Sequence, residues 1–503
     1  MRASIAAETA GVPSVSIVCP GFEGQATATA RGHGFDDLAL AVTAGHVDAV
    51  STEQLIEDFI AITVDQVIGG LVPGGRVTGG LVPGGLVPSG RATGGRAMAG
   101  EADIAPPDAS EVGADAVAAE PAARDIVATG SIDEINRIFV ERGWSDGLPI
   151  VPPTVERIER FLAPLGHDPW RRIGIAKSSG RDMTVWSVVV NAVMAGCRPD
   201  DLPVLLAAAE ILADPAYGME HSGNTTGADA LMILNGPIIT DGGFNHGPGA
   251  LREGSPPNTR IGRWLRLYLR NVGGFTADQH DTATFGNRAR GVLAEDEAAL
   301  AEIGWEPLAA DFGFAAGQDV LTMARMNSGL IIGSVFGSSP DELLPYLGDG
   351  LARVSGWDLT HNYGLGNGQF RPLLVLSPVL ARIFAAAGWS KDEVKAGLFR
   401  HARIPAWRYE HLIGRWSNLT AGRRTLVDLV AEGGLPDAFA RSADPDRLVP
   451  VVVDPSRFLI AVAGDPNRTN AYAFSNDGPH GDYTASAIDR RVSDDLACVV
   501  PGA

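Results

Sequence analysis

The stretch GVPSVSIVCPGFEGQATATARGHGFDDLALAV, residues 11–42, decides the fold class. Within it, SVSIVC at 14–19 and LALAV at 38–42 are short apolar runs typical of buried strands, and a helix is expected between them over Gln25–His33. The apolar spacing over 52–68 predicts a further helix. This alternation is the signature of a parallel α/β sheet. Because two strands do not make a stable domain, residues 1–68 are interpreted as an incomplete α/β unit.

A linker and a large domain are predicted to follow this unit. Residues 69–130 repeat an LVPGG sequence and continue with Ala, Asp, Glu and Pro, a composition with too little apolar bulk to fold, so a flexible linker is expected. From Ser131, where a capping box with Glu134 predicts a helix start, apolar strands alternate with helices. The pattern predicts a large mixed α/β domain over 131–492 and a tail at 493–503. Its expected helices lie at 185–196, 202–214, 257–274 and 392–402, and its expected strands at 230–239, 330–337, 372–378 and 458–464.

Composition restricts the class of protein. The formal net charge is −20, which opposes binding to nucleic acid and to anionic membranes. The three cysteines lie far apart without zinc-ligand spacing, so no disulfide framework is expected. No signal peptide and no apolar run long enough to span a bilayer is recognisable. A cytoplasmic protein without a nucleic-acid or membrane partner is therefore expected.

Polar residues typical of a binding site gather between residues 221 and 281, around the predicted strand at 230–239. Loops at strand ends are where α/β proteins bind ligands. We expect His221 or His246 to transfer protons, because a histidine titrates near neutral pH, and Asn224 and Asn235 to bind the substrate. The alternative is a long surface loop of turn-forming residues.

The helix predicted over 257–274 carries a stripe of arginines on one face, at positions 260, 263, 266 and 270. Such a stripe can bind a carboxylate or phosphate, or it can pair with neighbouring Asp and Glu side chains. Arg260 lies in the first turn, where a positive charge is unfavourable against the helix dipole. It is therefore the residue that we expect to orient an acidic substrate.

Evidence for a cofactor is weak in the sequence. Asp278, His280 and Asp281 are candidate metal ligands, but no recognised ligand spacing accompanies them. GLGNG at 364–368 leads into a predicted strand and fails the dinucleotide fingerprint, and no phosphate-binding loop or serine-hydrolase elbow occurs. The sequence thus contains no NAD or ATP signature.

Cys19 ends the first predicted strand, which is a typical position for a reactive group in an α/β unit. It is a candidate catalytic thiol, and the alternative is a small buried apolar side chain. Cys197 and Cys498 are interpreted as structural or incidental.

The segment AGVPSVSIVCPGFEGQATATARGHGFDDLALAV resembles the UGSC family, which is named for a selenocysteine-Gly-Ser-Cys motif with cysteine in place of selenocysteine in many members. The 131–492 region also looks like the large domain of such proteins. The stretches that carry this second likeness are GWSDGLPIVPPT (143–154), LNGPI (234–238), NTRIGRWLRLYLRNVGG (258–274), WEPL (305–308), AGWSKDEVKAGLFRHARIP (387–405) and AVAGDP (461–466).

The resemblance implies thiol or selenol redox chemistry, but neither form of the motif occurs in this chain, which starts about where the motif ends. An upstream selenocysteine codon read as a stop is one expected explanation, and loss of the redox group is the other. Our leading hypothesis is a redox enzyme acting on a small anionic organic molecule, with an electron-donor protein as a further partner. A non-catalytic binding or assembly subunit and a metal-dependent lyase or hydrolase remain alternatives, and oligomerisation stays open.

Overall fold

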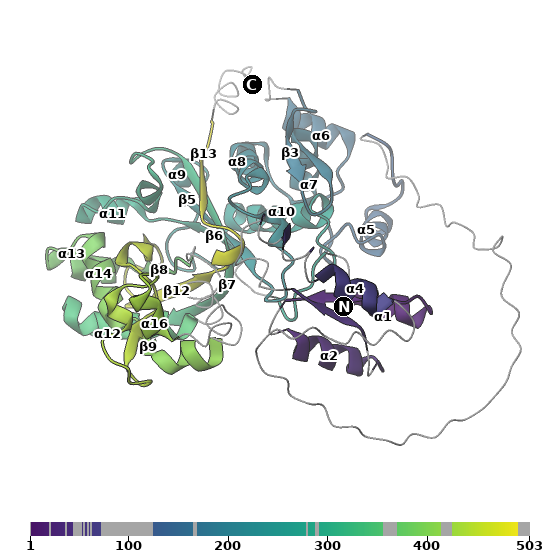
Figure 1. Ribbon diagram of the computed structural model, residues 1–503. Coiled ribbons are helices and arrows are strands. Elements are labelled where there is room, and N and C mark those ends of the chain that lie inside the picture. Colours follow the sequence, from purple (N-terminus) through teal and green to yellow (C-terminus); the bar gives the residue numbers. More distant parts are fainter. Residues whose placement is uncertain are drawn as a thin grey trace, which may run out of the picture. The chain divides into compact units, whose positions relative to one another are not determined.

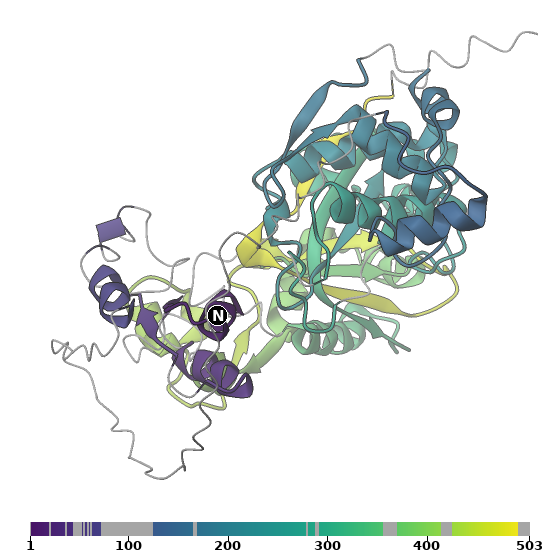
Figure 2. The ribbon, with the colours of Figure 1, turned by 90° about the vertical axis from the view of Figure 1, so that its right-hand side faces the viewer.

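In the computed structural model the chain divides into two compact units, which are described separately (Figures 1 and 2). The first comprises Met1–Val18, Phe22–Thr43 and Glu57–Thr129, and the second comprises Gly130–Ala503 with the short stretches Cys19–Gly21 and Ala44–Ile56. The structure describes residues 2–19, 22–35, 38–43, 53, 56–57, 60, 63–71, 124–163, 168–277, 280–286, 291–355, 370–413 and 425–490.

The first unit has the predicted α/β order. Its elements are α1 (Arg2–Thr9), β1 (Ser16–Val18), α2 (Glu23–Gly32), β2 (Leu40–Val42) and α4 (Val64–Leu71). The two strands pair in parallel, with Ser16 opposite Leu40 and Val18 opposite Val42. The expected parallel pairing is confirmed. Most of the stretch predicted as a linker, residues 72–123, lies outside the described residues.

The second unit combines helices with one large sheet and two small ones. The helices are α5 (Ile132–Glu141), α6 (Val155–Leu162), α7 (Val185–Ala195), α8 (Leu202–Ala213), α9 (Ile238–Asp241), α10 (Pro256–Asn271), α11 (Glu297–Ile303), α12 (Pro340–Val354), α13 (Pro378–Ala386), α14 (Lys391–His401) and α16 (Leu426–Ala431). The strands are β3 (Arg172–Ala176), β4 (Arg181–Thr184), β5 (Asp229–Asn235), β6 (Gly291–Ala294), β7 (Val320–Ile332), β8 (Leu373–Leu376), β9 (Arg403–Pro405), β10 (Leu448–Pro450), β11 (Leu459–Val462), β12 (Ala471–Asn476) and β13 (Thr484–Ala487).

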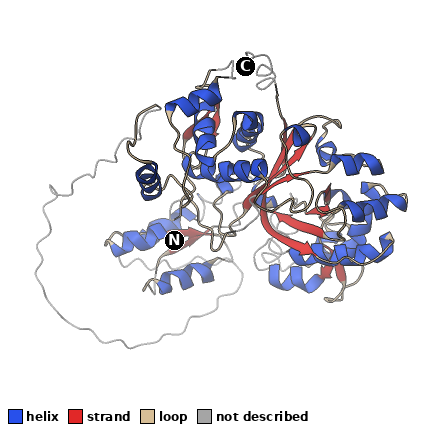
Figure 3. Cartoon of the chain, turned by 180° about the vertical axis from the view of Figure 1, so that it is seen from behind, coloured by secondary structure: helices blue, strands red, loops and turns tan. Residues whose placement is uncertain are grey.

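The large sheet is mixed, with the order β11-β8-β12-β7-β5-β6 and with β13 added beside β7. Figure 3 shows the strands in red and the helices in blue. The outer pairs β5–β6 and β11–β8 are parallel, whereas β7 and β12 pair antiparallel with their neighbours. The predicted mixed α/β class is confirmed. The two edges of the sheet also meet, which shows that the sheet is bent. Asp296, just after β6, donates its backbone N–H to the carbonyl oxygen of Val462 in β11 at 2.7 Å.

The bend gives the sheet an apolar inner face. All six strands of the main order contribute side chains to one buried cluster, including Leu231, Leu293, Ala324, Val375 and Leu459. Helices contact the sheet along its whole width (Figure 1). Helix α10 contacts β6, α8 contacts β7 and β13, and α12 contacts β7 and β12. Helix α13 contacts β8, and α14 contacts β11. This close-packed arrangement fixes the strands and the loops at their ends, which carry the polar residues described below.

Two predicted strands have different bounds. The strand expected over 230–239 ends at Asn235, because Gly236 turns with a φ of 94° and the short helix α9 follows. The strand expected over 330–337 is wrong in its second half: β7 spans Val320–Ile332, and Ser334 turns the chain with a φ of 52°. The capping box is confirmed, since Ser131 Oγ accepts a hydrogen bond from the backbone N–H of Glu134 and the Glu134 carboxylate accepts one from that of Ser131.

Candidate functional site

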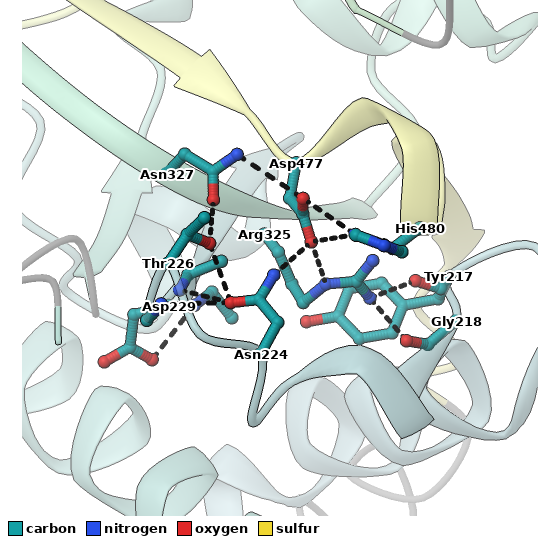
Figure 4. A network of polar contacts seen from close by, with 12 residues as sticks. Tyr217, Gly218, Asn224, Thr226, Asp229, Arg325, Asn327, Asp477 and His480 are labelled. Atoms are coloured by element: carbon teal, nitrogen blue, oxygen red, sulfur yellow. Dashed lines mark hydrogen bonds and ion pairs between the residues drawn. The ribbon is translucent and has the colours of Figure 1, made fainter. Parts of the chain in front are cut away.

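A buried ion pair lies where β7 and β12 run side by side (Figure 4). Arg325, in the middle of β7, and Asp477, directly after β12, are 3% and 1% exposed, and Arg325 Nε lies 3.4 Å from Asp477 Oδ2. The guanidinium also donates to the backbone carbonyls of Tyr217 and Gly218. A buried charge is tolerated only when it is paired and hydrogen-bonded, and both conditions are met here.

Asp477 is the hub of this network. Asn224 Nδ2 donates to Asp477 Oδ2 at 2.8 Å, and Asn327 Nδ2 lies 3.4 Å from Oδ1. His480 Nδ1 lies 3.1 and 3.2 Å from the two carboxylate oxygens. Burial raises the pKa of the Asp477 carboxyl, but the hydrogen bond with His480 and the charge of Arg325 outweigh burial, so the pKa lies below its ordinary value. Asp477 is therefore a carboxylate at neutral pH.

Two histidine rings face each other beside this carboxylate. His221 ends the short turn Met219–His221, His480 ends the turn Gly478–His480, and their ring centroids are 4.6 Å apart at an interplanar angle of 30°. Burial lowers the pKa of His221, and the neighbouring charges of His480 and Arg325 lower it further. His221 is thus mainly neutral at pH 7. His480 keeps 27% of its side chain exposed, so both rings are accessible from solvent.

Two glycines allow this close approach. A Cβ atom on Gly218, whose φ is 65°, would lie 2.0 Å from the carbonyl oxygen of His480. A Cβ atom on Gly481 would lie 2.2 Å from the carbonyl oxygen of Tyr217. Any other residue would push the two turns apart. The histidine pair therefore depends on backbone contacts that only glycine permits.

The arrangement is suited to proton transfer. A carboxylate that holds Nδ1 of a histidine fixes the ring orientation and the tautomer, and it leaves Nε2 on the far side of the ring. A neutral histidine next to it can accept or relay a proton. The Thr226 hydroxyl lies 2.8 Å from both Asn224 Oδ1 and Asn327 Oδ1, which holds the two amides in place (Figure 4).

The predicted site residues fall into two groups at opposite ends of β5. His221 and Asn224 precede the strand and join the Asp477 network, whereas Asn235 ends the strand and His246 follows it. Seven residues of strand span about 20 Å, so the two groups do not form one pocket. At the far end, Asn235 Nδ2 donates to Glu295 at 2.6 Å and to Glu297 at 3.1 Å.

His246 lies in that second group, with Nδ1 3.6 Å from Asp296 Oδ2, which is longer than a hydrogen bond.

Arg260 is bound by a neighbouring carboxylate instead of facing a cavity. Its Nε and Nη2 atoms donate to the two oxygens of Asp201 at 2.5 and 2.7 Å, and its side chain is 13% exposed. This placement favours the ion-pairing alternative for Arg260.

The remaining candidates are Cys19, His280, Asp281 and Asp278. Cys19 directly follows β1 in a half-buried position. His280 and Asp281 lie on the segment that packs against Gly223, and Asp278 lies outside the described residues. In the described ranges, no group of three or more His, Cys, Asp or Glu side chains is arranged to hold a metal ion.

Sequence reasoning missed Arg325, Asn327, Asp477 and His480. A signal was present: Arg325 interrupts the apolar run VLTMARMN, and a charge inside a strand needs a buried partner. The turn NDGPHG then supplies an acid and a histidine three residues apart. Neither feature identifies its partner, because Arg325 and Asp477 are 152 residues apart in sequence.

Comparison with known protein families gives a match in the N-terminal part of the chain. The sequence model of the UGSC family matches residues 1–72, which agrees with the resemblance seen in the sequence. No curated protein matches the chain. No helix in the described ranges is both long and apolar enough to cross a membrane.

Proposed function

We propose that this chain is an enzyme whose large unit transfers a proton to or from a small organic substrate at the Asp477–His480–His221 site. The observation that carries the proposal is the contact of His480 Nδ1 with a buried carboxylate, beside a second histidine whose pKa is lowered. In this mechanism Asp477 orients His480 and stabilises its protonated form, and His480 exchanges the proton through Nε2. His221 accepts or relays that proton, and Asn224 and Asn327 hold the carboxylate in place.

Turnover tests this proposal. Wild-type protein is incubated with a panel of small organic acids and carbonyl compounds, with and without dithiothreitol, and product formation is followed by NMR. His480→Gln is expected to lower the rate of any reaction found by about 100-fold or more, which is the usual contribution of a general acid or base. His401→Gln is the matched control, because this exposed histidine ends α14. Unchanged turnover in His480→Gln would refute the assignment.

Thiol or selenol redox chemistry is the second candidate, and the match of residues 1–72 to the UGSC family favours it. In this chain Cys19 is the proposed thiol, because it is half-buried at the end of a parallel strand, whereas Cys197 is buried. The substrate would be reduced, with a small thiol or a protein as the electron donor. Loss of dithiothreitol-dependent turnover in Cys19→Ser, with turnover kept in Cys197→Ser, would support this role; equal activity in both variants would remove it.

A further inference from the structure

A pocket beside α11 lies at the end of β5 opposite the proton-transfer site. Its lining residues include the acidic residues Glu297 and Glu306 and the apolar residues Leu300, Trp305 and Pro307. Leu300 and Trp305 are largely buried, at 2% and 7% exposure, so their positions are set by the core. The pocket therefore presents rigid apolar walls with two acidic groups.

The charge of this pocket is not balanced by its own walls. No Lys, Arg or His is among its lining residues, and in the part of the chain that the structure describes neither carboxylate takes part in an ion pair within 4 Å. Glu306 is exposed at the rim. Carboxylates beside apolar walls create a negative potential that attracts cations, and a low-dielectric surface strengthens it.

Glu297 is held in a fixed orientation. Its Oε1 accepts hydrogen bonds from the backbone N–H of Gly236 at 2.7 Å and from Asn235 Nδ2 at 3.1 Å. Asn235 is 1% exposed, and within the described structure its Oδ1 atom has no hydrogen-bond partner. The Asn235 side chain therefore acts here as a hydrogen-bond donor, through Nδ2, to the carboxylates of Glu295 and Glu297. With Oε1 occupied, Oε2 of Glu297 is the oxygen that can bind a ligand.

We propose that this pocket binds a small organic cation, a substituted ammonium compound. The carboxylates of Glu297 and Glu306 would neutralise the ammonium group, while Leu300, Trp305 and Pro307 would contact its hydrocarbon part. An organic cation fits better than an inorganic divalent one, because only two carboxylates line the pocket and divalent ions take more protein or water oxygens. The proposal does not depend on the chemistry of the Asp477 site.

Calorimetric titration of the full chain with choline chloride tests this inference. We expect millimolar binding by the wild type and at least about fivefold weaker binding by Glu306→Gln, because one charge is removed at the rim. Glu302→Gln is the matched control: it removes an exposed carboxylate of α11 that pairs with Arg382 and does not line the pocket. Its choline affinity should equal that of the wild type.

Further arms of the titration separate the ligand classes. Glu297→Gln should also weaken choline binding. Because Glu297 accepts a hydrogen bond from the Gly236 N–H, this variant could also alter the fold, so its circular dichroism spectrum is compared with that of the wild type. Glu306→Gln removes no such hydrogen bond. Magnesium chloride and sodium acetate are expected to give no binding at this pocket. The proposal is overturned if wild type does not bind choline, if Glu306→Gln binds it as tightly as wild type, or if magnesium competes with it.

Discussion

Asp477→Asn removes the charge that compensates Arg325 while it preserves the shape of the side chain. The Arg325 and Asp477 side chains are 2% and 1% exposed, so the guanidinium would be left buried without a counter-charge. Breaking a buried pair from one side costs about 3–5 kcal/mol. Because Arg325 keeps its hydrogen bonds to the carbonyls of Tyr217 and Gly218, we expect the lower end, about 3 kcal/mol.

The cost is measured by urea unfolding, read through hydrogen exchange of peptides that cover β7 and β12, so that only the large unit is reported. Asp349→Asn is the control: it breaks an exposed pair with Arg353 on α12 and should cost less than about 1 kcal/mol.

The pH dependence has a defined sign. The folded pKa of Asp477 lies below its unfolded value of about 3.9, so its stabilisation is present above that value and is lost as pH falls through the folded pKa. The difference between wild type and Asp477→Asn should persist from pH 7 to about pH 4 and shrink below it. Equal costs for the Asp477 and Asp349 variants at pH 7, or a difference that grows on acidification, would refute the reasoning.

Three further outcomes are expected. His480→Gln should raise the pKa of His221 towards its ordinary value, since burial and then the charge of His480 lower it; two-dimensional NMR titration measures this, and an unchanged pKa would contradict an effect of His480 on the neighbouring ring. Arg260→Gln should destabilise the large unit by about 3 kcal/mol in urea unfolding, because it leaves a buried aspartate unpaired; a neutral effect would reopen a ligand-binding role. Gly218→Ala should shift the ring signals of His480, whereas Gly243→Ala, also at positive φ but with open space around it, should leave them unchanged.

Uniform apolar runs made much of the fold predictable. The helices α7 and α8 and the strands β8 and β11 agree with the sequence-based predictions. Each is an almost wholly apolar run, and the length of the run distinguishes a buried helix from a buried strand. The first half of β7 was not predictable in this way. The sequence of this half contains Thr322 and Arg325. A charged residue in an apolar run predicts an exposed position as long as its buried partner is unknown.

The candidate site was predictable only in part, for the same physical reason. Loop position and residue type identified His221 and Asn224, which do lie in the Asp477 network. The same criteria selected His246, which lies at the opposite end of β5, because sequence does not reveal whether a loop folds back along the strand that it follows. Long-range contacts cannot be predicted from the spacing of residues along the chain. Asn224 and Asp477, for example, are 253 residues apart.

The tautomer of His480 tests the central claim most directly. If Asp477 accepts a hydrogen bond from Nδ1, the neutral ring carries its proton on Nδ1, and Nε2 is the basic nitrogen that exchanges protons with a substrate. Two-bond ¹H–¹⁵N correlation spectra of ¹⁵N-histidine-labelled protein distinguish the two tautomers. The account predicts the Nδ1–H tautomer for neutral His480, lost in Asp477→Asn. An Nε2–H tautomer in the wild type would contradict it.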